Sequence, residues 1–317
     1  MPPATGNAAF PVLRLRGVRC IWSAGRHNAF TDLLRHRGAW WCAFREASEH
    51  LSDDGVLRLL VSPDGARWRP AACIARAGED LRDPKLYALA DGRFMLLAAA
   101  ALPDGETHQT CCWYSTDGLA WGEAQPLAAP GDWLWRITRH GRTSLGVAYR
   151  TDYPAPGEWA MHARLYRSVD DGPFECVRDP LVAEGNPNES AIVFDAGGTA
   201  YCLLRRDPGN ALFGRAVAPH EDWHWLDCGR RIGGPHMIAL PDGRLLAGVR
   251  LLDGGERTAL CWVDAASGRL HECLALPSGG DTSYPGLDWH AGLLRVSYYS
   301  SHEGRSAIYL AEVNLPL

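Results

Sequence analysis

Charged and aromatic side chains recur in six short stretches of the sequence, and they are of the types that act chemically on small polar ligands. One stretch places Asp83 between Arg82 and Lys85, another contains Glu189, and a third contains Tyr284. Guanidinium groups bind carboxylates bidentately, and a phenol becomes a nucleophile when a neighbouring carboxylate takes its proton. The six stretches are residues 27–32, 81–85, 133–136, 186–190, 233–236 and 281–285.

An internal repeat indicates which elements position these stretches. The pattern S-x-D-G-x-x-W begins at Ser62 and again at Ser115, and a degenerate copy begins at Ser168 (115 − 62 = 53 and 168 − 115 = 53). A chain of 317 residues holds almost six units of this length. A fixed period of about 50 residues is typical of propellers.

Turns between short apolar runs repeat with the same frequency. Runs such as residues 94–98 and 293–298 are typical of strands, and no segment of 10 or more residues shows helical periodicity. The sequence therefore predicts an all-β fold, a six-bladed β-propeller with four-stranded blades. Each stretch named above precedes one of the turns and would form the inner strand of a blade, lining the axis. The turns contain Gly38, Gly92, Gly141, Gly198, Gly243 and Gly292.

The whole chain is expected to form a single domain. The predicted blades cover residues 25–75, 76–128, 129–180, 181–230, 231–277 and 278–317. The last blade is too short to be complete, so a strand within residues 10–22 is expected to close it. Polar side chains enter from all six inner strands, whereas a purely structural propeller could close its axis with small residues. This pattern favours a ligand site on the axis.

Composition excludes several partners. A formal charge of −5 and a pI near 6.2 argue against a nucleic-acid partner. No stretch is apolar enough to span a membrane, and no basic segment followed by an apolar run begins the chain, so a cytoplasmic protein is expected. The ten cysteines are scattered without the spacing of metal knuckles. Buried free thiols, with no metal and no cofactor, are therefore expected, and the oligomeric state stays open.

The S-x-D-G-x-x-W repeat resembles the Asp box of sialidases and related BNR-repeat propellers. In such a hairpin turn the Asp caps backbone amides, the Gly takes a positive φ, and the Trp packs under the turn. The role is structural, so Asp64, Asp117 and Asp170 are expected on the outer edge, away from the site.

Two further stretches resemble the active site of the same superfamily. The run from Asn188 to Phe194 and the following Arg205 are similar to a sialidase hairpin in which a Glu and an Arg sixteen residues later (205 − 189 = 16) meet in the site. In that family the Glu polarises a tyrosine nucleophile and the Arg binds the substrate carboxylate. The strands containing Arg257 and Tyr284 resemble those that carry a second such Arg and the nucleophile. The resemblance implies an exo-acting glycoside hydrolase in which Glu189, Arg205, Arg257 and Tyr284 converge on one cavity.

The first blades depart from that pattern. The family places an Arg-Ile-Pro triplet on the first axial strand, where this chain has residues 27–30, and the loop that holds the family's acid/base Asp contains His50 instead. Histidine titrates near neutrality, so His50 is a candidate acid/base. Asp83 is the rival acid, although two flanking cations would hold it ionised and suit it to accept sugar hydroxyls. The substrate is therefore expected to be an acidic or a hydroxyl-rich sugar.

Two alternatives remain open. Propeller polysaccharide lyases acting on uronate-containing glycans use His and Tyr for proton abstraction and Arg to neutralise the carboxylate, roles that His50, His236, Tyr284 and Arg82 could fill. A non-catalytic carbohydrate-binding propeller is the other. The expected catalytic residues are Tyr284, Glu189, His50 and Asp83. The expected substrate-binding residues are Arg45, Arg82, Lys85, Trp135, Arg136, Arg205, His236, Arg257, Tyr299 and His302.

Overall fold

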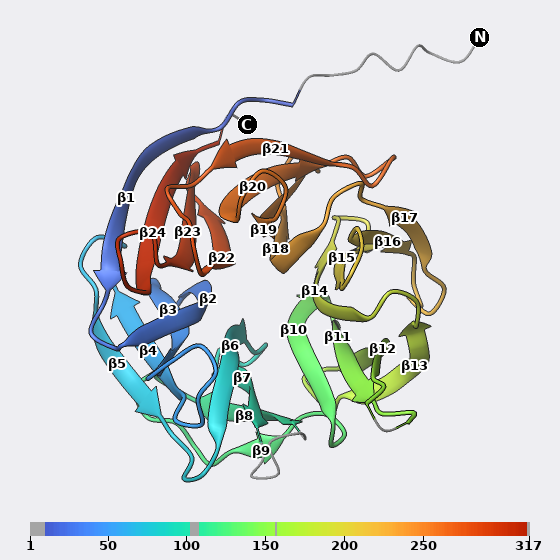
Figure 1. The fold of residues 1–317 in the computed structure, drawn as a ribbon, viewed down its shortest axis with the longest axis horizontal. Helices are drawn as coiled ribbons and strands as arrows, with labels where there is room; N and C mark the ends of the chain where they lie inside the picture. The colour runs from blue at the N-terminus through green and yellow to red at the C-terminus, as the bar shows by residue number, and fades with distance from the viewer. Residues whose placement is uncertain (1–9, 102–107, 156, 316–317) are drawn as a thin grey trace.

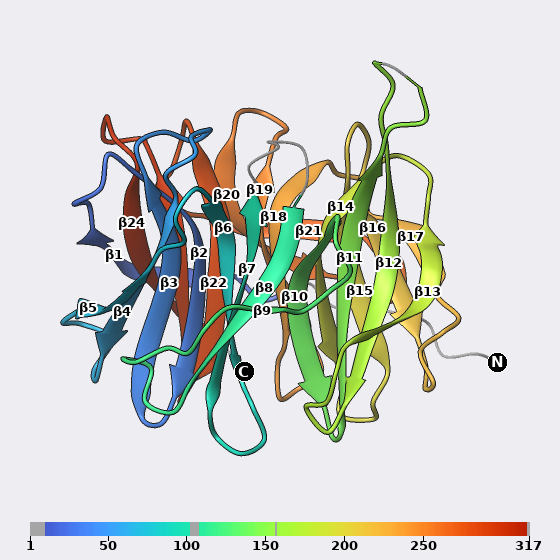
Figure 2. The ribbon, with the colours of Figure 1, turned by 90° about the horizontal axis from the view of Figure 1, so that it is seen from below.

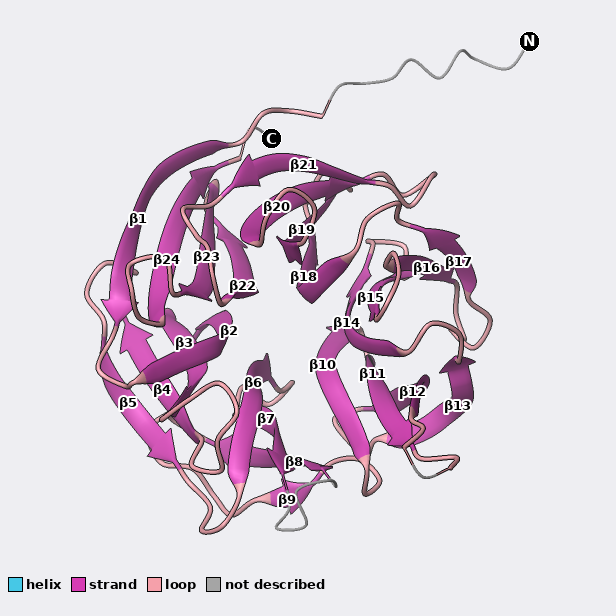
Figure 3. Cartoon of the chain, viewed as in Figure 1, coloured by secondary structure: helices cyan, strands magenta, loops and turns pink. Residues whose placement is uncertain are grey.

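The computed structural model describes residues 10–101, 108–155 and 157–315. In this part of the chain every regular element is a strand, and the strands form six antiparallel, four-stranded sheets around a central axis (Figure 1, Figure 3). Seen from the side, the strands run roughly along the axis and the loops gather at the two faces (Figure 2). The prediction of an all-β six-bladed propeller is confirmed. No helix among the described residues is long and apolar enough to cross a membrane.

Five blades follow the chain order from inner to outer strand. Blade 1 contains β2 (His27–His36), β3 (Ala39–Ala47), β4 (Val56–Ser62) and β5 (Arg69–Ile74). Blade 2 contains β6 (Asp80–Ala88), β7 (Phe94–Ala101), β8 (His108–Ser115) and β9 (Gln125–Pro126). Blade 3 contains β10 (Asp132–His140), β11 (Thr143–Asp152), β12 (Ala160–Val169) and β13 (Glu175–Val182). Blade 4 contains β14 (Pro187–Phe194), β15 (Ala200–Arg206), β16 (Leu212–Ala216) and β17 (His224–Asp227). Blade 5 contains β18 (Ile232–Ala239), β19 (Leu245–Leu251), β20 (Arg257–Val263) and β21 (Leu270–Ala275).

Blade 6 combines the two ends of the described chain. It contains β22 (Thr282–His290), β23 (Leu293–Ser300), β24 (Ala307–Asn314) and, as its outer strand, β1 (Arg14–Trp22). β1 is antiparallel to β24, with Arg14 opposite Asn314 (Figure 1). This pairing closes the ring of blades through hydrogen bonds rather than through a covalent connection.

Each inner strand is joined to the next strand of its blade by one of the six glycine turns. All six glycines have a positive φ, between 59° at Gly141 and 86° at Gly243. Side chains rarely adopt this conformation, and glycine adopts it without strain. The turns found in the sequence therefore mark the six strands that line the axis.

Every inner strand also contains a bulge at a similar depth. In β2 the pairing with β3 shifts between Ala29 and Asp32, and in β22 the pairing with β23 shifts between Ser283 and Gly286. The same irregularity occurs in β6, β10, β14 and β18. A bulge sets two residues opposite one and re-aims a side chain. The repeated bulges turn side chains of the inner strands toward the axis.

Apolar side chains pack between neighbouring blades. In one cluster Trp41 and Leu57 of blade 1 pack with Phe94 and Trp113 of blade 2. All ten cysteines are free thiols. Six are buried as expected, whereas Cys20, Cys73 and Cys176 are exposed.

The first two S-x-D-G-x-x-W turns connect the third and fourth strands of their blades. The Ser62 hydroxyl donates to Asp64, whose Oδ1 also accepts hydrogen bonds from the backbone amides of Ala66 and Arg67, both at 2.9 Å. The degenerate third copy differs, because Asp170 pairs with Arg142. None of the three turn aspartates lines the axial cavity described below.

Candidate active site

A cavity of about 710 Å³ opens on the propeller axis. Five of the six inner strands contribute a side chain to it, because Phe30, Asp83, Trp135, Glu189 and Tyr284 all lie at or beside the bulges. The size is within the usual range for small-ligand sites. Asp80, Arg82 and Trp133 of the inner strands also line it. The remaining lining residues come from second and third strands and from loops: Ala101, Tyr149, His108, His50, Leu51, Ser52, Asp53 and Gly78.

A tyrosine and a glutamate form a short hydrogen bond at the cavity wall. The Tyr284 hydroxyl donates to Glu189 Oε1 at 2.5 Å. The other carboxylate oxygen of Glu189 accepts the backbone amide of Gly234 at 2.6 Å. The bulge of β22 gives Tyr284 a φ of 47°, a conformation that tyrosine seldom adopts. The backbone therefore holds the phenol in a fixed position against the carboxylate.

Two arginines support this pair from behind the cavity. Arg205 Nη1 lies 2.8 Å from Glu189 Oε1 and 3.5 Å from the Tyr284 hydroxyl. The guanidinium of Arg250 lies 5.3 Å from the centre of the Tyr284 ring, and its Nη2 donates to the Tyr299 hydroxyl at 2.9 Å. Neither arginine is among the residues that line the cavity. Their charges stabilise negative charge on the phenol and the carboxylate.

The surroundings set opposite protonation states for Tyr284 and Glu189. Burial alone would raise the pKa of Glu189, but the charge of Arg205 and the hydrogen bonds from Arg205, Tyr284 and Gly234 outweigh it and lower that pKa. Burial and the neighbouring Glu189 raise the pKa of Tyr284 well above its usual value, against the opposing charges of the two arginines. Glu189 is thus an ionised acceptor for the phenolic proton.

Asp83 is a second carboxyl group with an unusual state. It is 5 % exposed, and its Oδ1 has no hydrogen-bond partner in the described part of the chain. Burial raises the pKa of Asp83 to about 6, although Lys85 and Arg82 oppose the rise. The expectation that the two cations hold it ionised is therefore corrected, because loss of solvent outweighs them. Asp83 can carry a proton near neutral pH.

Lys85 lies behind this carboxyl group. Its ammonium group donates to the carbonyls of Asp83 and Pro84 at 3.3 Å and lies 4.8 Å from the centre of the Trp135 ring. Burial lowers the pKa of Lys85 to about 8. Lys85 therefore packs against residues of the cavity wall and does not itself line the cavity. This corrects the expectation that Lys85 binds substrate.

Aromatic rings from blades 1, 2 and 3 form part of the cavity wall. Trp133 stacks on Tyr149 with ring centres 5.5 Å apart, and His108 lies 4.7 Å from Trp133. The guanidinium of Arg82 lies over Phe30 at 5.2 Å. Flat apolar surfaces beside polar groups suit a sugar ring, which has both apolar faces and hydroxyl groups. The sequence placed Trp133 in an axial stretch without a binding role, and it did not single out Tyr149 or His108.

Arg45 organises the loop that follows β3. Its side chain is fully buried, and it donates to Asp80 at 2.8 Å, to the Glu49 carbonyl and to both the carbonyl and hydroxyl oxygens of Ser52. This loop brings His50 and Asp53 to the cavity. Arg45 therefore positions the loop, and the expectation that it binds substrate is corrected because its donors are already occupied.

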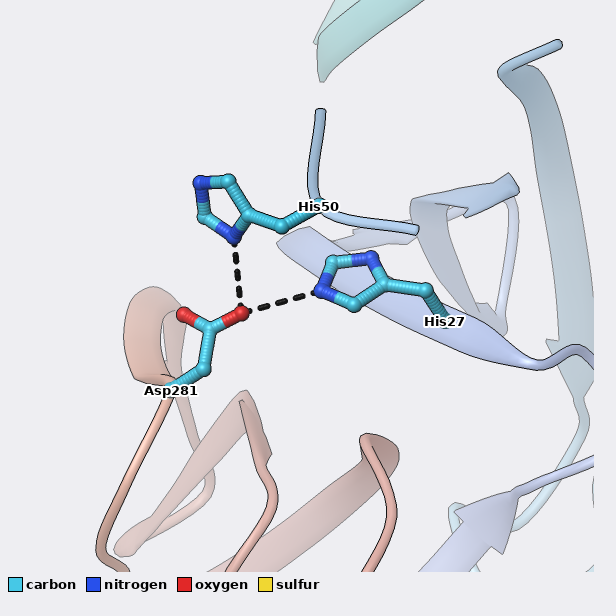
Figure 4. Close-up of side chains that lie close together, drawn as sticks. All are labelled: His27, His50 and Asp281. Carbon is cyan, nitrogen blue, oxygen red and sulfur yellow. Dashed lines mark hydrogen bonds and ion pairs between the residues drawn. The ribbon is translucent and has the colours of Figure 1, made fainter. Parts of the chain in front are cut away.

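Two histidines share one carboxylate oxygen beside the cavity. Asp281 Oδ2 lies 2.7 Å from His50 Nδ1 and 2.9 Å from His27 Nε2 (Figure 4). The other oxygen of Asp281 accepts a hydrogen bond from the Tyr299 hydroxyl at 2.7 Å. Tyr299 is buried and belongs to this network rather than to the cavity lining. His50, by contrast, lines the cavity as expected.

Arg257 does not join Glu189, Arg205 and Tyr284, and this expectation is corrected. It begins β20, the third strand of blade 5, and pairs with Glu272 and Asp253 away from the axis. Arg250 on β19 occupies the place expected for Arg257. A signal for it was present, since Arg250 follows Gly243 by the same seven residues by which Arg205 follows Gly198 (250 − 243 = 7 and 205 − 198 = 7).

Three other expected binding residues have structural partners. Arg136 is buried against Asp32 at 2.9 Å. His236 is buried and accepts a hydrogen bond at Nδ1 from the Leu287 amide, and burial lowers its pKa well below the usual value. His302 contacts Ser300 and the Tyr309 ring. None of the three is among the residues that line the cavity, which corrects their assignment.

No protein-family model and no curated protein matches the sequence. Among solved structures, a protein of unknown function from Dyadobacter fermentans DSM 18053 has 20% identity and a TM-score of 0.84, over 97% of this chain and 100% of that one. An α-L-arabinofuranosidase from Fusarium graminearum, in complex with an iminosugar inhibitor, has 12% identity and a TM-score of 0.73, over 95% and 98%. Trypanosoma rangeli sialidase, in complex with the inhibitor DANA, has 12% identity and a TM-score of 0.71, over 95% of this chain and 58% of that one. The chain shares their six-bladed propeller, so the expected likeness to sialidase-like propellers is confirmed for the fold.

Proposed function

We propose that this protein is a glycoside hydrolase in which Tyr284 is the nucleophile. The observation that carries the proposal is the 2.5 Å hydrogen bond from the Tyr284 hydroxyl to an ionised Glu189 at the wall of the axial cavity. Two glycosidases with this fold, an arabinofuranosidase and a sialidase, support the reaction class.

The residues have complementary roles. Tyr284 attacks the anomeric carbon while its proton passes to Glu189, and Arg205 and Arg250 stabilise the charge that develops. Asp83 is protonated because its pKa is raised, and it donates its own proton to the departing glycosidic oxygen. The intermediate is an aryl glycoside between the sugar and Tyr284. A water molecule, deprotonated by Asp83, then attacks the same carbon, the bond from that carbon to the Tyr284 oxygen breaks, and Glu189 returns the proton to Tyr284.

The charges at the cavity favour a neutral, hydroxyl-rich sugar over an acidic one. Four of the described lining residues are acids, namely Asp53, Asp80, Asp83 and Glu189. Arg82 is the arginine among them, and it pairs with Asp80 at 3.2 Å. Arg205 and Arg250 already donate to protein acceptors, so neither has a pair of guanidinium N–H groups available to bind a substrate carboxylate bidentately. Carboxylates and aromatic rings recognise sugar hydroxyls and ring faces.

Tyr284→Phe tests the nucleophile directly. The unaltered protein is assayed against a panel of neutral and acidic aryl glycosides, and we expect it to release the phenol from the neutral ones. In Tyr284→Phe we expect turnover to fall by about 10³-fold or more, because the attacking oxygen is gone. Sugar binding, measured by calorimetry, and Tm should change little, since only a hydroxyl is removed.

Two results would redirect the proposal. Full turnover in Tyr284→Phe, together with its loss in Glu189→Gln, would make Glu189 the nucleophile. Products that absorb in the near ultraviolet would indicate an unsaturated sugar, and therefore a lyase.

A further inference from the structure

The cluster of His27, His50 and Asp281 has the composition of a metal site. The three ligand atoms, His27 Nε2, His50 Nδ1 and an Asp281 oxygen, lie within 4.8 Å of one another. They come from blade 1, the loop after β3, and the residue before β22, and their side chains point toward one another (Figure 4). Ligand spacing along the sequence gave no hint of them, because the three positions are far apart in the chain.

We propose that these three side chains bind one divalent transition-metal ion, with Zn²⁺ the best match, at the edge of the axial cavity. Two imidazoles and one carboxylate are a common ligand set for such ions, and a tetrahedral Zn²⁺ keeps a fourth position for water. Ligand atoms around Zn²⁺ are about 3.3 Å apart, from bond lengths of about 2.0 to 2.1 Å. The separations from Asp281 Oδ2 to the two imidazole nitrogens, 2.7 Å and 2.9 Å, need only a small expansion to reach this value, and the two nitrogens lie within 4.8 Å of each other.

Neighbouring groups orient the carboxylate for this role. The Tyr299 hydroxyl holds Asp281 Oδ1, which leaves Oδ2 facing both imidazoles. Hydrogen bonds of this kind commonly fix metal ligands in place. Arg250 Nη2 lies 3.7 Å from Asp281 Oδ1, and its charge lowers affinity for a cation. Arg250 faces Oδ1, however, and not the oxygen that faces the imidazoles. It also donates hydrogen bonds to the Tyr299 hydroxyl and the Thr282 carbonyl.

The proposed metal site is open to solvent, and an ion bound there would link two blades. The side chain of His50 is 44% exposed and that of Asp281 is 30% exposed, so an ion can enter from solvent. His50 belongs to the cavity-lining loop of blade 1, whereas Asp281 belongs to blade 6. A bound ion would tie this loop to the neighbouring blade and fix one edge of the cavity. The inference is independent of the proposed hydrolase activity.

Metal titration tests the inference without an activity assay. Protein is treated with chelator, its exposed thiols Cys20, Cys73 and Cys176 are alkylated, and Zn²⁺ is titrated by calorimetry. We expect one ion per chain, and a rise in Tm with added Zn²⁺ because the ion binds the folded state. In His27→Gln and Asp281→Asn we expect affinity to fall at least about tenfold, and the rise in Tm to disappear.

His162→Gln is the matched control. His162 Nδ1 also lies 2.7 Å from a carboxylate, Asp152, but on blade 3 and outside the cluster. It should retain the affinity of the unaltered chain. Each variant is compared without metal, so that loss of folding is seen separately. No stoichiometric binding by the unaltered chain, or equal affinity in Asp281→Asn, would overturn the inference.

Discussion

Two carboxyl groups that face the same cavity have opposite electrostatic surroundings. Glu189 accepts hydrogen bonds from three donors, one of them the charged Arg205, so its pKa is lowered. Asp83 is buried and one of its oxygens has no partner among the described residues, so its pKa rises to about 6. Pairs of carboxyl groups with separated pKa values are typical of acid and base assignments in enzymes. The difference depends on burial and partners, which the order of residues does not display.

Asp83→Asn should make stability less dependent on pH. The folded-state pKa of Asp83 is raised, so its stabilising contribution is complete below the unfolded value near 4 and is lost as pH rises through about 6. Between pH 4 and pH 7, the free energy of unfolding of the uncharged variant should therefore rise by about 2 to 3 kcal/mol relative to that of the unaltered protein. Urea unfolding at several pH values measures this difference. Asparagine also tolerates the φ of 53° at this position.

The same variant should lose activity while gaining stability. Removal of a general acid typically lowers turnover by about 10²- to 10⁴-fold. An aryl glycoside with a good leaving group should be affected less. A stability difference that does not vary with pH would show that folding does not raise the pKa of Asp83.

Bulges in the inner strands are the elements that shape the cavity. Gly234, in the bulge of β18, illustrates how closely they pack, because an added Cβ would lie 2.8 Å from Cγ of the Tyr284 ring. Its backbone amide also binds Glu189. One bulge thus holds both members of the proposed nucleophile pair.

Gly234→Ala should therefore impair catalysis more than stability. The Tyr284 ring must move, and a displacement of about 1 Å can lower turnover by about 10²-fold. Gly243→Ala is the control, since Gly243 also has a positive φ, 86°, but nothing within 4 Å of the added Cβ. The positive φ alone should cost both variants about 1 to 2 kcal/mol of stability, and Gly234→Ala should lose more because its Cβ also displaces Tyr284. Equal turnover in the two would contradict a positioning role for the β18 bulge.

The sequence predicts elements better than side-chain directions. The turn glycines and the 53-residue period suffice to define six blades, since both follow from local backbone requirements. Glu189 and Arg205 are predictable because a single hairpin joins them. Arg257 was misplaced because adjacent strands of one blade both carry arginines, and only strand order distinguishes Arg250. Asp281 and His27 meet through closure of the whole ring, which no local pattern encodes.

At the scale of the molecule, closure depends on one strand pair. β1 and β24 pair from Arg14 opposite Asn314 to Trp22 opposite Ile308, with two shifts of register along the way. Without β1, the backbone of β24 would form an open sheet edge, which favours self-association.

A chain that starts at residue 23 should be less stable and should associate. Several half-buried apolar side chains of β1, including Val18 and Ile21, contribute about 1 kcal/mol each, so the loss is on the order of 5 kcal/mol. This corresponds to a fall in Tm of roughly 10 °C. Calorimetry and size-exclusion chromatography measure both effects. A synthetic peptide of residues 10–24 should restore stability in trans, and an unchanged Tm without it would show that β1 does not hold the ring.

The register between Arg14 and Asn314 has a consequence for the order of the blades. A short peptide joining these two positions would convert β24 and β1 into an ordinary hairpin, and the polypeptide would become a closed loop with no preferred origin. Any connection between blades could then be cut to give a circularly permuted chain. The ring geometry therefore does not determine which blade comes first in the chain.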